Sequence, residues 1–133
     1  MTSKITYLGD LRTSSIHLQS GSEIISDAPI DNNGKGEAFS PTDTVANALG
    51  SCMFTVMGIK AQDLNVDISN STAEITKIMA ADPRRISEIH VVFNFSAVTD
   101  AKNKTILERT AMTCPVYYSL HPDIKKEITF NWK

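Results

Sequence analysis

The chain has 133 residues, of which 41% are hydrophobic and 21% are charged, and its formal net charge is −2. This length and composition are typical of one folded domain, so we expect a single domain over residues 1–133. The basic residues are scattered, which argues against a nucleic-acid partner. No stretch approaches the roughly 20 apolar residues of a membrane span, and residues 1–10 lack the apolar core of a signal peptide. We therefore expect a cytoplasmic protein that does not enter a membrane.

The first 36 residues have the pattern of short strands joined by turns. Residues 5–8, 12–18 and 23–26 are prone to form strands, and glycine-containing turns separate them. They predict a three-stranded meander. Residues 31–36 are rich in Asn and Gly and predict an exposed loop.

A helix is predicted to begin at Ser40. Ser40 supplies an N-cap hydroxyl, Pro41 suits the first helical position, and Asp43 places an acid in the first turn. Residues 44–61 are almost uncharged and apolar nearly all round, which predicts a buried core helix. One stripe of this helix is expected to carry Val45, Ala48, Leu49, Cys52, Met53, Val56 and Ile59.

The second half of the chain predicts strands over residues 72–79 and 89–95, with a turn at 82–85 between them. A helix over residues 100–113 and a short helical segment starting at Cys114 and Pro115 follow, and residues 126–132 form a closing strand. The predicted order is βββ-α-ββ-α-β. Because strands and helices do not alternate regularly, the fold class is α+β.

The two cysteines, Cys52 and Cys114, are the residues best suited to chemistry. Cys52 lies in the middle of the apolar helix, where it is either a small core residue or a reactive thiol. Cys114 directly precedes Pro115 and so is expected at a helix N-cap, where the helix dipole lowers the pKa of a thiol. The two lie 62 residues apart, so the sequence leaves open whether they meet.

No cofactor or metal is expected. The three histidines share no ligand spacing with each other or with the cysteines, and the chain has no phosphate-binding glycine loop. Of the kinds of chemistry considered, the sequence therefore supports either thiol chemistry or none.

Two motifs resemble those of the OsmC/Ohr family. Residues 39–52, FSPTDTVANALGSC, are similar to the core helix of that family, which starts after a proline and ends its motif on a cysteine. Cys114-Pro115-Val116, followed by Ser119-Leu120, resembles the second motif, and the order of elements matches over essentially the whole chain.

The resemblance implies an intertwined homodimer with the long helices packed centrally. In the peroxidase members the first cysteine, here Cys52, attacks an organic hydroperoxide, and the second, here Cys114, resolves the sulfenic acid as a disulfide. A dithiol reductant, of lipoyl type in some members, would reset the pair. This chemistry serves defence against oxidative stress.

The resemblance also implies an arginine that activates the thiol. Arg12 is the best match by its distance from Cys52, and Thr42 occupies the position of the family glutamate. Asp43 lies nine positions before Cys52, about 180° around a helix, so it should face away and serve as a cap.

Two other functions stay open at this stage. The same dimer could be a non-catalytic module that binds an apolar small molecule, with Cys52 as a lining residue. The cysteines could instead form a thiol redox sensor. A disulfide that forms on exposure to peroxide separates the thiol functions from the binding module.

Overall fold

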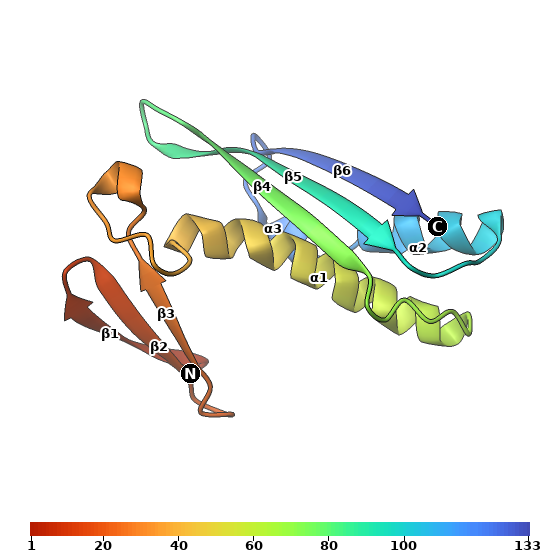
Figure 1. Cartoon of the computed structure of the whole chain (residues 1–133), viewed down its shortest axis with the longest axis horizontal. Helices are drawn as coiled ribbons and strands as arrows, with labels where there is room; N and C mark the ends of the chain where they lie inside the picture. Colours follow the sequence, from red (N-terminus) through yellow and green to blue (C-terminus); the bar gives the residue numbers. More distant parts are fainter. The chain divides into compact units, whose positions relative to one another are not determined.

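The computed structural model describes residues 1–133 and confirms the α+β class. It divides into two compact units, residues 1–45 and 46–133, in which the elements follow the predicted order (Figure 1). Whether the chain acts as one domain stays a prediction. The elements are β1 (Ser3–Gly9), β2 (Arg12–His17), β3 (Glu23–Asp27), the 3-10 helix η1 (Ile30–Asn32), α1 (Pro41–Asp63), β4 (Thr72–Ala80), β5 (Arg85–Phe95), α2 (Ala101–Ala111), α3 (Pro115–Ser119) and β6 (Lys125–Trp132).

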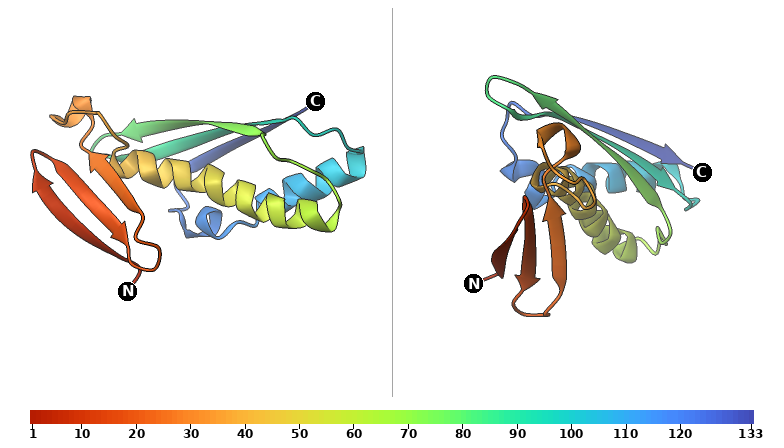
Figure 2. Two further views of the ribbon diagram at one scale, coloured as in Figure 1. Left: turned by 60° about the horizontal axis from the view of Figure 1, so that its bottom comes forward. Right: turned by 60° about the vertical axis from the view of Figure 1, so that its left-hand side comes forward.

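The first unit contains the predicted meander, in which β2 pairs with both β1 and β3 in antiparallel register. Figure 2 shows the three strands side by side in both of its views. The β1–β2 turn places Gly9, Asp10 and Leu11 at positive φ. No residue of β1 is buried. None of the buried hydrophobic residues lies in the meander, so it has little core of its own, since sheets are stabilised by packing one face away from water.

The predicted start of α1 is confirmed. Ser40 Oγ accepts a hydrogen bond from the backbone N–H of Asp43 at 3.0 Å, and Asp43 Oδ2 accepts one from the backbone N–H of Ser40 at 3.0 Å. This reciprocal pair is a capping box with an aspartate in the glutamate position. The helix then continues to Asp63, two residues beyond the predicted end.

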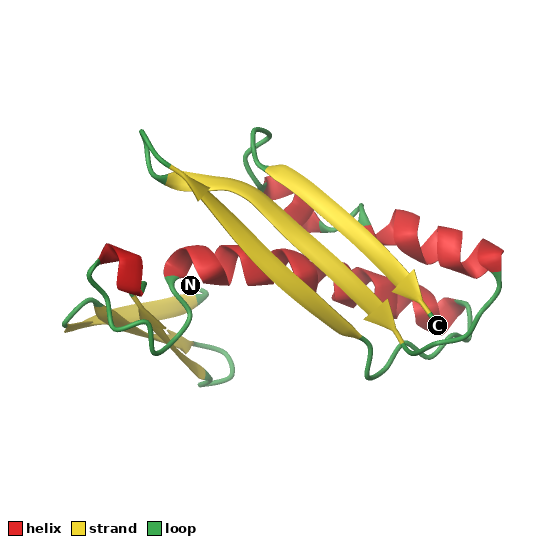
Figure 3. Cartoon of the chain, turned by 45° about the horizontal axis from the view of Figure 1, so that its top comes forward, coloured by secondary structure: helices red, strands yellow, loops and turns green.

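The second unit is a three-stranded sheet covered by helices on one face (Figure 3). β4 and β5 are antiparallel, whereas β5 and β6 are parallel because α2 and α3 carry the chain back across the same face. Every second residue of β5 from Ile89 to Phe95 is buried against the helices. The core also contains Ala46, Leu49, Met53, Met57, Ala61, Leu107, Ala111 and Cys114.

The predicted buried stripe of α1 is wrong in part. Leu49 and Met53 are buried, but Val45 is 40% exposed and Ile59 is 62% exposed. Gly50 is buried instead, and a Cβ on it would lie 2.6 Å from Ile75 Cδ1. Because α1 is apolar on nearly every side, periodicity could not select the face that β4 and β5 cover. None of the helices has the length and apolar character needed to span a lipid bilayer.

The capping box supplies a stability prediction. Replacing Ser40 by Ala removes the acceptor for the N–H of Asp43, so the free energy of unfolding should fall by about 1 kcal/mol. Ser40→Thr keeps the hydroxyl and should lose less. Urea unfolding followed by circular dichroism measures both variants, and equal losses for the two would contradict the capping role.

Candidate thiol site

Cys52 and Cys114 are both free thiols in the second unit. Cys52 lies in the middle of α1 next to the buried Met53, and its side chain is half-buried against the core. Cys114 follows α2 and is completely buried, with 0% of its surface exposed. Access to solvent is therefore unequal: a reagent from water can meet Cys52 before it meets Cys114.

Cys114 occupies the N-cap of α3, as predicted. Its backbone is extended, with φ −68° and ψ 142°, and its Sγ accepts a hydrogen bond from the backbone N–H of Tyr117 at 3.2 Å. Pro115 takes the first helical position, where its missing N–H is not needed. The cap arises from the sequence Cys-Pro itself.

The expected direction of the Cys114 pKa shift is wrong. Burial raises the pKa of the Cys114 thiol, and this effect exceeds the lowering by the backbone N–H groups of Tyr117 and Val116. Desolvation disfavours a thiolate more than one short helix can stabilise it. At neutral pH Cys114 is therefore a protonated thiol.

The two cysteines are neighbours, which the sequence could not decide. The nearby Cys52 side chain raises the pKa of the Cys114 thiol further. The two cysteines meet because α1 and α3 pack on the same face of the β4–β6 sheet. A protonated buried thiol thus lies beside a thiol that solvent can reach.

Arg12 lies in the first unit, where it binds two carboxylates. Its Nε and Nη2 donate to Asp27 at 2.7 and 2.8 Å, and Nη2 also donates to Glu37 at 2.9 Å. Asp27 is only 1% exposed, and the hydrogen bonds from Arg12 hold the pKa of its carboxyl below the ordinary value. Asp27 and Glu37 were missed from the sequence, although Asp27 faces Arg12 directly in the β2–β3 register. A role for Arg12 toward Cys52 stays a prediction.

Thr42 and Asp43 belong to the start of α1. Asp43 makes the capping hydrogen bond described above, which confirms its predicted role. Thr42 Oγ1 lies 3.2 Å from the hydroxyl of Ser40. No three histidine, cysteine, aspartate or glutamate side chains lie close enough together to hold a metal ion.

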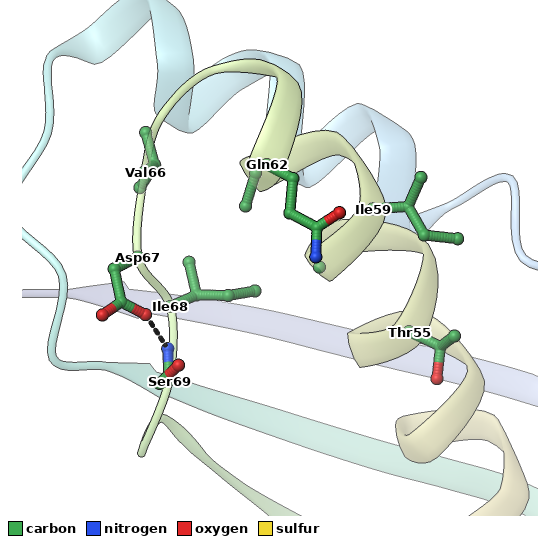
Figure 4. Close-up of a pocket in the computed structure, with 9 residues that line it drawn as sticks. Thr55, Ile59, Gln62, Val66, Asp67, Ile68 and Ser69 are labelled. Atoms are coloured by element: carbon green, nitrogen blue, oxygen red, sulfur yellow. Dashed lines mark hydrogen bonds between the residues drawn. The ribbon is translucent and has the colours of Figure 1, made fainter.

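The second unit also contains a pocket beside the end of α1 (Figure 4). Its volume is about 380 Å³, and Asp67, which lines it, accepts a hydrogen bond from the backbone N–H of Ser69. A smaller pocket of about 140 Å³ lies between the middle of α1 and β4. Neither pocket is lined by Cys52 or Cys114. The larger pocket is lined by Thr55, Gly58, Ile59, Ala61, Gln62, Val66, Asp67, Ile68 and Ser69.

A helix that carries one cysteine, followed by a second cysteine at an N-cap, is the arrangement that the sequence motifs anticipated. The OsmC-like protein model matches residues 34–129, a range that includes both cysteines. The chain belongs to the OsmC-like family. None of the curated proteins matches it.

Solved structures of this family resemble the chain closely. A protein from Psychrobacter arcticus, described as an osmotic stress induced and detoxification response protein, is 59% identical to this chain. Its TM-score is 0.96 over 98% of this chain and 96% of that one. An OsmC-like protein from Mycoplasma pneumoniae is 14% identical, with a TM-score of 0.81 over 98% and 94%. An organic hydroperoxide resistance protein from Legionella pneumophila is 10% identical, with a TM-score of 0.75 over 98% and 97%. The last two show the shared fold.

The unequal burial of the thiols predicts unequal alkylation. Native protein treated with iodoacetamide at pH 8 should be modified at Cys52 well before Cys114, because Cys114 is both buried and protonated. Denaturation should make the two rates similar. Peptide mass spectrometry over time measures each site, and equal native rates would contradict the assigned environments.

Proposed function

We propose that this protein is a thiol-dependent peroxidase that reduces organic hydroperoxides in defence against oxidative stress. The observation that carries the proposal is the pairing of a half-exposed Cys52 with a buried, protonated Cys114. Membership of the OsmC-like family supports it, as does the fold shared with the hydroperoxide resistance protein from Legionella pneumophila. Two free thiols also suit a reducing compartment, so we propose a cytoplasmic location.

In the first step the thiolate of Cys52 attacks the terminal oxygen of the hydroperoxide. The O–O bond breaks, Cys52 becomes a sulfenic acid, and the rest of the substrate leaves as an alcohol once it gains a proton. Cys52 takes this role because its side chain is half-buried, whereas that of Cys114 has no contact with solvent.

In the second step Cys114 attacks the sulfur of the Cys52 sulfenic acid. A disulfide forms and water leaves, which prevents oxidation to the sulfinic acid. A small dithiol, of lipoyl type in some family members, then exchanges with the disulfide: the dithiol is oxidised to its own disulfide and both protein thiols return.

Substituting the two cysteines should have different effects. Cys52→Ser should abolish hydroperoxide consumption, because no nucleophile remains at the exposed position. Cys114→Ser should consume about two equivalents and then stop, one to form the Cys52 sulfenic acid and one to oxidise it to sulfinic acid, since no thiol condenses with its sulfenic form. Peroxide assays and intact-mass spectrometry measure both outcomes. Full activity in Cys52→Ser would exclude the peroxidase, and multiple turnovers in Cys114→Ser with dithiol present would make Cys114 structural.

We further propose that Arg12 is the cation that favours the Cys52 thiolate. Its guanidinium is held in one orientation by the paired hydrogen bonds to Asp27 and the contact with Glu37. A cation close to a thiol stabilises the ionised form. An arginine already fixed by carboxylates loses little conformational freedom when it meets the thiolate.

Arg12→Ala should shift the pH dependence of Cys52 oxidation to higher pH by about one unit, because the thiolate loses its cation. Arg12→Lys keeps the charge without the planar fork and should show a smaller shift. Stopped-flow oxidation rates between pH 5 and 9 provide the curves, and circular dichroism checks that both variants are folded. Superimposable curves for wild type and Arg12→Ala would remove Arg12 from the site.

A homodimer is also part of the proposed function. The meander presents large apolar side chains to water: Ile5 is 65% exposed and Ile24 is 61% exposed. Val45 and Ile59 add exposed apolar surface along α1. Exposed large apolar side chains in this number favour a protein interface. A second copy of the chain is the partner that the family resemblance implies.

Sedimentation equilibrium at micromolar concentration should show a stable dimer. Ile5→Asp would place a charge in the proposed interface and should weaken association by at least tenfold, since burying an unpaired charge is costly. Lys4→Asp, on the neighbouring exposed position of β1, is the matched control. A folded wild-type monomer at these concentrations would overturn the proposal.

The non-catalytic binding module stays as the second candidate; the sequence predicted that Cys52 would line its site, whereas the 380 Å³ pocket offers space for a small molecule elsewhere. That pocket is not lined by Cys52, so ligand binding there would leave the reactivity of the thiol unchanged. A redox sensor would form the same disulfide without sustained turnover. Repeated cycles in the presence of a dithiol separate the enzyme from both.

A further inference from the structure

The larger pocket of the second unit is a candidate binding site that neither cysteine lines. Its volume of about 380 Å³ lies within the range of pockets that hold small molecules. One wall is formed by the last turns of α1, and the other by residues 66–69, which run back beside that helix (Figure 4). A molecule held between these walls contacts neither thiol, so the site is separate from the proposed thiol chemistry.

Hydrogen bonds hold the two walls in place. The backbone N–H of Val66 donates to the carbonyl of Ala61 at 2.9 Å, which fastens the returning segment to the end of α1. The hydroxyl of Ser96 donates to the carbonyl of Ser69 at 3.1 Å, which fastens the other end of the segment next to the end of β5. A ligand therefore meets walls that are already formed, and less ordering is needed when it binds.

The lining combines apolar surface with one charged residue. Ile59, Val66 and Ile68 supply most of the apolar surface. Gly58 leaves space, since a Cβ on it would meet no atom within 4 Å. Asp67 is the only charged residue in the lining. The pocket thus suits a ligand with an apolar body and a complementary positive charge.

Two features make this part of the chain negative. The Ser69 side chain and its backbone N–H, which donates to Asp67 Oδ1 at 2.9 Å, hold the pKa of the Asp67 carboxyl below its ordinary value. The pocket also adjoins the C-terminal end of α1, where the helix dipole places a partial negative charge. Lys60, the basic residue of the last turn, lies outside the lining and 3.9 Å from the carboxylate of Asp63.

We propose that this pocket binds a small organic cation, with an ammonium group at Asp67 and a short apolar body against Ile59 and Ile68. An ammonium donates charge-assisted hydrogen bonds to a carboxylate, and the amide oxygen of Gln62 is a further acceptor in the lining. The apolar body gains from leaving water. A carboxylate ligand of the same size would meet the negative charge of Asp67 and be repelled.

Three ligands of similar size and different charge test the proposal: 2-phenylethylammonium, 2-phenylethanol and phenylacetate. Each is titrated into 15N-labelled protein at pH 7, and the amide shifts are followed by NMR. Ile59 also belongs to the apolar surface assigned to a second copy, so the full chain is used in its native oligomeric state. The ammonium should give saturable shifts over residues 58–69, the alcohol should bind about tenfold more weakly, and phenylacetate should give no saturable shift.

Three variants test the assigned residues. Asp67→Asn keeps an acceptor for the N–H of Ser69 but removes the charge, and it should weaken binding of the ammonium by about tenfold. Asp63→Asn, near the same end of α1 but outside the lining, is the matched control and should bind like wild type. Gly58→Leu places a side chain in the pocket and should abolish binding of all three ligands, while leucine suits the helix. Circular dichroism checks that the variants are folded.

Two results would overturn the inference. Equal affinity for the ammonium and the alcohol, or wild-type affinity in Asp67→Asn, would show that Asp67 does not select a cation. No saturable shift over residues 58–69 with the ammonium would remove the pocket as a site, including the case in which a second copy covers it. The proposed thiol chemistry is tested apart from these results: the ammonium should leave the alkylation rate of Cys52 unchanged, and a slower rate would place the ligand at the thiols and contradict the inference.

Discussion

The Cys114 side chain is completely buried in the core, which raises the pKa of its thiol, while Cys52 next to it is only half-buried. This difference in solvation separates two side chains of identical chemistry. Cys52 can meet a reagent from solvent first, and Cys114 can react only after its neighbour has changed. The assigned roles in the peroxidase cycle depend on it, because two equally exposed thiols would compete for the same substrate.

Two features of the chain produce this difference in burial between Cys52 and Cys114. Cys114 and Pro115 start α3 shortly after α2 ends at Ala111, and Cys114 is the N-cap with its side chain buried. The return of the chain through α2 and α3 makes β5 and β6 parallel, and it keeps α3 on the face that α1 also covers. The meander of residues 1–45 contributes no residue to this core. It presents instead the ion pair of Arg12 with Asp27 and an apolar surface that we assign to a second copy of the chain.

The sequence predicted the local features well. Ser40 and Pro41 located the start of α1, the alternation of β5 located the sheet, and Cys-Pro located the cap of α3. The sequence was less informative about features that depend on packing, such as which residues of a helix are buried. An all-apolar α1 has no preferred face in its periodicity, so Val45 and Ile59 were placed wrongly.

The predicted direction of the Cys114 pKa shift was wrong for a related reason. The helix N-terminus can be read from sequence, but the burial that outweighs it depends on long-range contacts. The pairing of Cys52 with Cys114 across 62 residues also needed the three-dimensional structure. Asp27 and Glu37 were missed because acidic residues in a strand and a loop carry no local signal of an arginine partner.

The most direct test of the account is the bond between the two sulfurs. Reduced protein is treated with one equivalent of cumene hydroperoxide and analysed by non-reducing peptide mass spectrometry. The account predicts one intramolecular disulfide joining the Cys52 and Cys114 peptides, together with one equivalent of the alcohol. Consumption of the peroxide without this disulfide, or no consumption at all, would contradict it.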